Sequence, residues 1–262
     1  MKLSASKLAI VAASLVATGA FAQAKAPEPD WSVSYNLGAV SEYRYRGISQ
    51  SAKRPALQGG VDLSHKGGFY LGAWGSTIEW IKDTPAAPVT AKGPVEIDLY
   101  GGYKADIGKT GLSYDIGLLQ YWYAGNNLAN TNSTTGAVQP NTLEAYAALT
   151  YGVVTAKYSQ STTNLFGTAN SKGSEYLDLS ATFDLGKGWS VVPHLGHQKV
   201  KNFANYADYS LAVNKDIDGL VLSATLVGTN WKRGTRPEYT LPGSGTRNLS
   251  GSTLVLGIKK NF

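Results

Sequence analysis

The segment WSVSYNLGAVSEYRYR, residues 31–46, alternates apolar and polar side chains along almost its whole length. Val33, Tyr35 and Leu37 share one parity, while the other parity is polar and ends in Arg44 and Arg46. Because successive side chains of a strand leave opposite faces, the pattern predicts a strand with one apolar and one polar face. At ~3.3 Å per residue, the segment is longer than a common strand of ~5–6 residues. It therefore predicts a tilted strand that crosses a bilayer into the headgroups.

The first residues predict export. Lys2 and Lys7 precede an apolar run over residues 8–22, and small-x-small cleavage sites end at Ala22 and Ala24. We expect a signal peptide over residues 1–24, a short periplasmic linker over 25–30 and an outer-membrane β-barrel over 31–262. A membrane-anchoring helix is less favoured because the run is shorter than the ~20 residues needed to span.

Composition excludes several classes of protein. The chain has no cysteine, so neither disulfides nor thiol chemistry contribute. Its formal charge of +6 is mild and scattered through connections, which argues against nucleic-acid binding. The mean hydropathy of −0.17 is typical of a soluble protein. Barrel strands can give the same value, because each lipid-facing residue alternates with a lumen-facing one.

Further segments repeat the alternating pattern, separated by glycine-rich turns or longer polar connections. Short turns follow every second strand, as in outer-membrane barrels with short periplasmic turns. We therefore predict an all-β fold, an antiparallel up-and-down transmembrane β-barrel of about 12 strands with both termini periplasmic. Pro193 makes its strand the weakest assignment and predicts a bulge, because proline cannot donate to a ladder. The expected strands cover 31–46, 57–64, 69–80, 95–105, 112–122, 143–151, 154–163, 176–185, 189–199, 206–215, 220–229 and 249–262.

Aromatic residues gather near the ends of these strands, which predicts two interfacial belts. One belt lies at the turn side and the other at the loop side. Phe262 ends the chain on the apolar parity of its strand and resembles the signal read by the barrel assembly machinery, although Lys260 departs from that pattern. The turn-side belt comprises Trp31, Phe69, Tyr103, Tyr114, Tyr151, Phe183 and Trp189, and the loop-side belt comprises Tyr43, Tyr45, Trp122, Tyr158, Tyr206 and Trp231.

Charged residues on the polar parity are the candidate pore lining. Twelve strands predict a narrow or partly obstructed lumen, and charges lining a pore select ions. Arg44 and Arg46 are expected near the outer mouth, as an entrance filter. The alternative is that these charges pair with one another and plug the barrel. The candidates are Glu42, Arg44, Arg46, Glu96, Asp98, Lys104, Glu144, Asp178 and Asp208.

A long basic connection near the C-terminus suggests contact with anionic lipid. It carries Lys232, Arg233, Arg236 and Arg247, which could face lipopolysaccharide phosphates at the outer-membrane surface. Ordinary solvated loop charge is the alternative reading of this connection.

An enzyme is the second functional hypothesis, because a membrane-surface hydrolase could use a barrel of this size. It would need a histidine beside a serine, and only His65, His194 and His197 are present. His194 and His197 point to opposite faces of one strand and cannot share a metal without a bulge. We therefore expect no catalytic residue, no metal site and no cofactor. A non-conducting binding or anchoring barrel and a soluble periplasmic barrel remain further alternatives.

Several blocks of the sequence resemble the proteobacterial Gcw_chp family, also called the TorF family of porins. The blocks are YRYRGISQ (43–50), PALQGG (55–60), GFY (68–70), WGS (74–76), EIDLYGGY (96–103), DY (208–209) and KDI (215–217). The resemblance covers essentially the whole mature chain. It implies an outer-membrane barrel that passes small solutes, and it implies no particular solute or site residue. Together with the charged lumen parity, we expect a channel for small hydrophilic solutes or ions.

Overall fold

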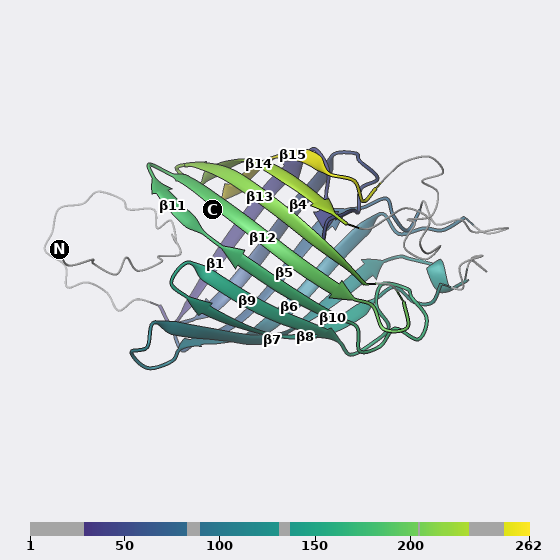
Figure 1. Cartoon of the computed structure of the whole chain (residues 1–262), viewed down its shortest axis with the longest axis horizontal. Helices are drawn as coiled ribbons and strands as arrows, with labels where there is room; N and C mark the ends of the chain where they lie inside the picture. The colour runs from purple at the N-terminus through teal and green to yellow at the C-terminus, as the bar shows by residue number, and fades with distance from the viewer. Residues whose placement is uncertain (1–28, 83–89, 131–136, 204, 231–248) are drawn as a thin grey trace, which may run out of the picture.

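The protein folds into a closed antiparallel barrel of twelve wall strands (Figure 1). This computed structural model describes residues 29–82, 90–130, 137–203, 205–230 and 249–262. β10 and β11 together form one wall strand, and β15 pairs with β1 to close the wall. The wall strands are β1 (Trp31–Val40), β4 (Ala56–His65), β5 (Phe69–Thr77), β6 (Val95–Asp106), β7 (Leu112–Ala124), β8 (Thr142–Tyr151), β9 (Val154–Ser161), β10 (Glu175–Ala181) with β11 (Phe183–Gly186), β12 (Trp189–Lys199), β13 (Asn205–Ile217), β14 (Leu220–Thr229) and β15 (Thr253–Asn261).

The connections alternate in length, as the sequence predicts. Short turns join β4 to β5, β6 to β7, β8 to β9, β11 to β12 and β13 to β14, at the end where β1 begins and β15 finishes (Figure 1). Longer connections lie at the opposite end and include a 3₁₀ turn, η1 (Leu128–Asn130). We refer to these as the turn end and the loop end. The up-and-down topology of twelve strands is therefore confirmed.

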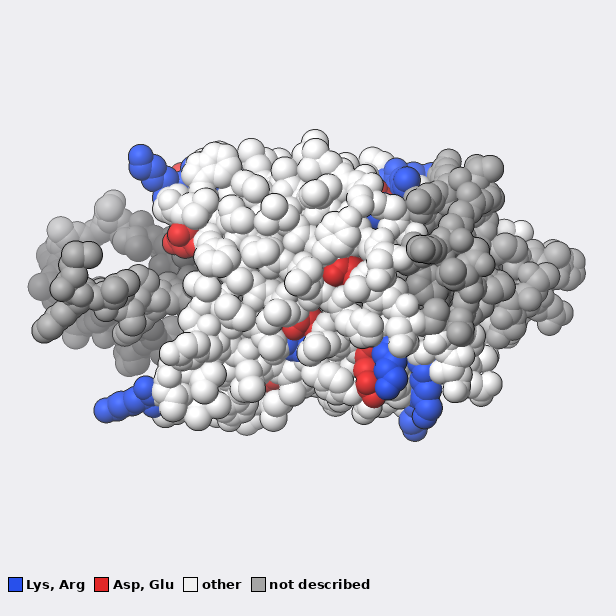
Figure 2. All heavy atoms as spheres, in the orientation of Figure 1, with Lys and Arg blue, Asp and Glu red and all other residues white. Residues whose placement is uncertain are grey.

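The outer face of the wall is apolar and the lumen face is polar. Leu37 and Leu57 are 62% and 66% exposed on the outside, and Leu254 on β15 is similarly exposed. Their strand neighbours Asn36 and Gln58 lie on the lumen face, as the period of two requires. Charged side chains visible from outside lie mainly toward the two ends, with a largely uncharged band between them (Figure 2). An exposed apolar band of this kind is unfavourable in water and favourable in contact with lipid.

Helices contribute almost nothing to this architecture. Within the described ranges, no helix is both long enough and apolar enough to span a membrane.

The first strand is shorter than predicted. β1 ends at Val40, and the polar residues after it leave the wall and turn into the lumen. There they form a small hairpin of β2 (Arg44–Tyr45) and β3 (Ile48–Ser49). Arg46 and Gly47 make its turn with φ angles of +46° and +78°, a left-handed backbone that cannot continue a strand. The predicted strand over 31–46 is wrong for its last six residues, 41–46, for this reason.

Pro193 lies in the middle of β12 without a bulge. The pairs Ser180↔His194 and Phe183↔Val191 keep one register on either side of it, so no extra residue is inserted. Instead, the neighbouring wall strand is interrupted between β10 and β11, beside Pro193, because proline has no N–H to donate to it. The predicted bulge at Pro193 is therefore wrong, and the missing hydrogen bond appears as a break in the neighbouring ladder.

The turn-side aromatic belt is present, and the loop-side belt is only partial. Phe69 and Tyr103 pack edge to face with ring centroids 4.9 Å apart, and Phe69 is exposed on the outer wall. At the loop side, Tyr43, Tyr45 and Tyr206 were expected to face outward. All three are instead directed inward, Tyr43 and Tyr206 being buried and Tyr45 half-buried. They pack inside because the loop that carries two of them folds into the lumen; Trp122 and Tyr158 remain outside, and Trp231 lies beyond the described residues.

Tyrosines in the lumen pack over glycines of adjacent strands. Gly117 on β7 faces Tyr146 on β8, and a Cβ added at Gly117 would lie 2.5 Å from the Tyr146 hydroxyl and 2.6 Å from the Gly101 carbonyl oxygen. The Tyr146 hydroxyl also hydrogen-bonds to Tyr70, whose hydroxyl donates to Asp115 at 2.5 Å. A phenol network therefore crosses the lumen between β5, β7 and β8.

Replacing Gly117 by Val is expected to destabilise the barrel. Overpacking of this kind costs ~1–3 kcal/mol, because the tyrosine must leave its rotamer or the strands must separate. The thermal unfolding midpoint of the detergent-refolded protein, followed by gel mobility, should decrease. Ala147→Val places the same side chain on the exposed outer face of β8 and should change little. An equal decrease in both variants would contradict the packing role of Gly117.

Candidate functional site

Residues 41–55 enter the lumen at the loop end and approach the opposite wall. We call this segment the infolded loop. A Cβ added at Gly47 would lie 2.8 Å from Cβ of Asp208 and 2.9 Å from the Gly228 carbonyl oxygen. On another side, the N–H of Ser49 donates to the Leu249 carbonyl at 3.0 Å. The loop is thus held against β13, β14 and the approach to β15.

Arg46 ties the tip of the infolded loop to three wall strands. Its Nη2 donates to both carboxylate oxygens of Glu144 on β8, at 3.0 and 2.7 Å, and its Nη1 donates to Oε1 of Gln198 on β12 at 2.6 Å. The guanidinium carbon also lies 4.1 Å from the ring centroid of Tyr176 on β10 and 4.7 Å from that of Tyr45. The Arg46 and Glu144 side chains are 5% and 3% exposed.

The Arg46 guanidinium stays protonated in this buried position. Burial lowers the pKa of Arg46, but the Glu144 carboxylate more than offsets this, and the pKa lies well above its ordinary value. The pair is therefore a buried, charge-assisted contact in which one guanidinium nitrogen, Nη2, donates to both carboxylate oxygens, and charge-assisted hydrogen bonds are among the stronger polar interactions in proteins.

Two tyrosines of the loop make further hydrogen bonds in the lumen. The Tyr43 hydroxyl donates to Oε1 of Glu96 on β6 at 2.6 Å, and the hydroxyls of Tyr45 and Tyr121 lie 2.5 Å apart. Burial raises the pKa of Tyr43, and the charges of Glu96 and Asp98 raise it further. Tyr43 therefore stays protonated and serves as a hydrogen-bond donor.

Arg44 fixes the loop to itself and to the segment before β15. Its Nε donates to Oε1 of Glu42 at 2.9 Å, and Nη2 of Arg44 also lies 2.9 Å from that oxygen. Nη1 donates to the carbonyls of Gly47 and Gly251, both at 2.8 Å. Its charge is thus matched within the loop.

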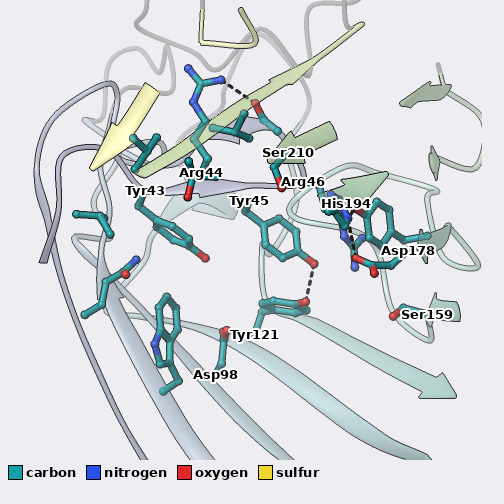
Figure 3. A pocket seen from close by; sticks show the side chains of 18 of the residues that line it. Tyr43, Arg44, Tyr45, Arg46, Asp98, Tyr121, Ser159, Asp178, His194 and Ser210 are labelled. Atoms are coloured by element: carbon teal, nitrogen blue, oxygen red, sulfur yellow. Dashed lines mark hydrogen bonds and ion pairs between the residues drawn. The ribbon is translucent and has the colours of Figure 1, made fainter. Parts of the chain in front are cut away.

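A cavity of ≈600 Å³ lies in the lumen and is lined by the infolded loop together with the wall. Figure 3 shows Tyr43, Arg44, Tyr45 and Arg46 of the loop on one side and Asp98 and Tyr121 of the wall facing them. This volume suits a small molecule. Residues from most of the wall contribute, including Gln58, Trp74, Leu119, Lys157, Ser159, Asp178, His194, Ser210, Thr225, Val227 and Val255.

His194 takes part in an acidic cluster on the β10, β12 and β13 side of the cavity. Its Nε2 lies 2.7 Å from Oδ2 of Asp178, and its Nδ1 lies 3.7 Å from Oδ1 of Asp208. The Tyr176 hydroxyl hydrogen-bonds to the Asp208 carboxylate at 3.1 Å. Within the described ranges, no serine hydroxyl hydrogen-bonds to His194.

The remaining histidines lie apart from this cluster. His65 accepts a hydrogen bond from the N–H of Gly67 in a turn, and His197 has the outward parity of β12. No group of three or more His, Cys, Asp or Glu side chains able to hold a metal occurs in the part of the chain that the structure describes.

All nine candidate pore residues lie in the infolded loop or on the lumen-facing parity of the wall strands. The structure brings Arg46 to Glu144, and Arg44 to Glu42, and it leaves Lys104 over the Tyr70 ring near the turn end, 5.7 Å from its centroid. Arg44 and Arg46 project from a loop inside the lumen, instead of from a wall strand at the mouth. Their predicted position on the wall is wrong because the strand ends before them.

The lumen carries an excess of negative charge. Counting the wall away from its exposed strand ends together with residues 41–50 of the infolded loop, there are eight described carboxylates and four cations; Lys53 and Arg54, later in the loop, are exposed and are not counted. This leaves a formal charge of −4 with His194 neutral, opposite in sign to the whole chain. The carboxylates are Glu42, Asp62, Glu96, Asp98, Asp115, Glu144, Asp178 and Asp208, and the cations are Arg44, Arg46, Lys104 and Lys157.

Sequence reasoning missed the residues that complete these contacts. Gln198, Tyr121 and Tyr176 were read only as members of strands, although each binds the infolded loop. The available signal was Gly47 directly after a run of alternating Tyr and Arg, since a glycine there permits the tight turn.

The basic residues Lys232, Arg233, Arg236 and Arg247 lie outside the described residues. Phe262 pairs its N–H with the Tyr35 carbonyl at 2.9 Å and exposes its ring.

Comparisons with known proteins agree with this architecture. The family model described as "Bacterial protein of unknown function (Gcw_chp)" matches residues 23–262. A search of curated proteins gives no match. Among solved structures, the KdgM porin in complex with disordered oligogalacturonate is 8% identical, with a TM-score of 0.50, and the match covers 88% of this chain and 98% of that one. The NanC porin is 10% identical, with a TM-score of 0.49, covering 88% and 99%. At this identity, the KdgM match shows a shared fold.

Proposed function

This chain belongs to the Gcw_chp family, and we propose that it is an outer-membrane channel for small hydrophilic solutes or ions. The observation that carries the proposal is a polar, charged lumen with a ≈600 Å³ cavity inside a wall whose outer face is apolar. Lipid would contact the apolar band, and water and solute would occupy the lumen. The fold shared with the KdgM porin supports the same reading.

In this proposal the turn end and both termini face the periplasm, and the loop end faces outward. Residues 1–24 would direct export and be removed, and Phe262 would present the C-terminal strand to the barrel assembly machinery. The infolded loop would then narrow the path from the outer side. The loop is held there by the bridge from Arg46 to Glu144 and Gln198, and this supports the proposal that only small solutes would pass.

Solute flux into proteoliposomes tests the proposal. With the refolded protein, swelling in isosmotic urea or glycerol should be at least several-fold faster than in empty liposomes, and swelling in a disaccharide should be close to the empty control. This size order follows from a twelve-strand lumen that a loop partly fills. No swelling with any solute, from protein shown to be folded and inserted, would contradict a channel.

A non-conducting binding or anchoring barrel is the second candidate. It is favoured by the ion pairs of Arg44 with Glu42 and of Arg46 with Glu144, because matched charges inside a lumen can act as a structural plug. The two candidates predict different results when these ion pairs are broken. In a channel, the infolded loop would move and solute flux would rise. In a non-conducting barrel, the protein would lose stability and flux would not change. We propose no catalytic role for His194, because its ring nitrogens face Asp178 and Asp208.

A further inference from the structure

Asp98 is a buried side chain in which one carboxylate oxygen, Oδ1, receives no hydrogen bond from the described residues. It lies on the lumen face of β6, is 9% exposed and lines the cavity. Within the described part of the chain, nothing donates a hydrogen bond to its Oδ1. A buried polar atom left in this way is costly, and a carboxylate especially so. The side chain is therefore a candidate for a partner that is not part of the chain.

Among the described residues, no cation forms an ion pair with Asp98. Glu96, two residues away on the same face, is also buried and receives the hydroxyl of Tyr43, which is uncharged. The arginines in the cavity lining are already matched, Arg44 by Glu42 and Arg46 by Glu144, and Lys157 of the same lining lies with its Nζ 3.9 Å from the Tyr146 ring centroid. Two adjacent carboxylates thus share a buried wall, and the described residues form no ion pair with either. This local excess matches the negative charge of the lumen as a whole.

Aromatic rings line the cavity on both sides of Asp98. Figure 3 shows Asp98 with Tyr43 and Tyr121, and Trp74 lines the same cavity with its ring centroid 5.5 Å from that of Tyr43. Electron-rich ring faces attract organic cations, most strongly where water is excluded. A carboxylate among such rings offers both a hydrogen-bond acceptor and favourable surroundings for an alkylammonium group.

We propose that the cavity binds a small organic cation through a protonated amine, with Asp98 as the acceptor and Tyr43, Trp74 and Tyr121 around the bound cation. As a statement about the transported solute, this rests on the proposed function. The binding site itself can be tested without conduction. The channel would accordingly favour protonated amines over carboxylates of the same size.

Calorimetric titration of the refolded protein in detergent, with n-butylammonium chloride as probe, tests the site. Butylammonium should bind with a measurable heat, and sodium butyrate, of matched size, should not. Asp98→Asn keeps the shape of the side chain but removes its charge, and should weaken butylammonium binding at least tenfold. Asp106→Asn, at the exposed turn end of the same strand, is the matched control and should bind like the unmodified protein.

The outcomes separate this site from the channel itself. Butylammonium binding that Asp98→Asn abolishes supports the site even if the protein passes no solute, in which case only the proposed function fails. Swelling of proteoliposomes without butylammonium binding overturns the site and leaves the channel intact. Equal binding of butyrate, or unchanged binding by Asp98→Asn, also overturns it. Should Asp98→Asn not refold, Trp74→Leu is the second variant, and unchanged butylammonium affinity in that variant would count against the aromatic surroundings.

Discussion

Replacing Glu144 by Gln is expected to raise solute flux through the barrel by about tenfold or more. The change keeps the size of the side chain but removes the charge that Arg46 contacts at 2.7 Å in a buried setting. Leaving one member of a buried ion pair without its partner costs ~3–5 kcal/mol. Since each ~1.4 kcal/mol is a factor of ten in an equilibrium, a loop that is rarely released would be released for much of the time. Proteoliposome swelling in glycerol measures the change.

The control for Glu144→Gln is Glu175→Gln, which removes an acidic group whose contact with Lys199 is more exposed. That change should leave flux unaffected, because exposed pairs contribute ~0–1 kcal/mol. If Glu144→Gln lowers thermal stability while flux stays at the unmodified level, the Arg46 contact is a structural plug and the non-conducting alternative is favoured.

Replacing Gly47 by Val is expected to expel the infolded loop from the lumen. Gly47 has φ +78°, and its Cβ position is 2.8 Å from Cβ of Asp208 and 2.9 Å from a backbone oxygen of Gly228. A branched side chain there combines left-handed backbone strain of ~1–3 kcal/mol with a clash against a wall that cannot shift easily. Arg44 and Arg46 should then become accessible, so trypsin should cleave after these two arginines many times faster, whereas cleavage after the already exposed Lys53 should change little.

Gly125→Val is the matched control for Gly47→Val. Gly125 has φ +67° in the β7–β8 connection, and an added Cβ has nothing within 4 Å. It therefore reproduces the backbone strain without the clash. If both variants leave cleavage after Arg44 and Arg46 equally slow, the close approach of Gly47 to β13 and β14 does not hold the loop inside.

Much of the barrel was predictable because its wall obeys a local rule. Each wall strand must place apolar residues toward the outside and polar residues toward the lumen. The sequence of a wall strand therefore alternates with a period of two. Turn lengths alternate for the same topological reason. The strand 220–229, for example, matches β14 residue for residue. These features need no information about distant contacts.

The infolded loop was not predictable in the same way. The alternation of Tyr and Arg through residues 43–46 continues the strand pattern, although the chain has already left the wall. What decides its direction is a set of partners remote in sequence: Glu144 lies 98 residues and Gln198 152 residues from Arg46. The polar groups that were read as one face of a strand are instead satisfied by opposite sides of a lumen.

In the candidate site, too, the facing of the wall residues was predictable and their contacts were not. The parity rule placed Glu96, Asp98, Glu144, Asp178 and Asp208 on the lumen-facing side of their strands. It could not show which of them are matched by a cation, because pairing depends on how the strands close and where the infolded loop sits. That Oδ1 of Asp98 receives no hydrogen bond from the described residues is a property of this three-dimensional arrangement.

The measurement that tests the central claim most directly is the single-channel current of the refolded, unmodified protein across a planar bilayer in potassium chloride. The account predicts discrete openings interrupted by long closures, with a reversal potential under a salt gradient that shows a preference for K⁺ over Cl⁻, because acidic side chains outnumber basic ones in the lumen. A steady anion-selective current would contradict the charge assignment. A silent bilayer, with inserted protein and with Gly47→Val equally silent, would contradict the channel.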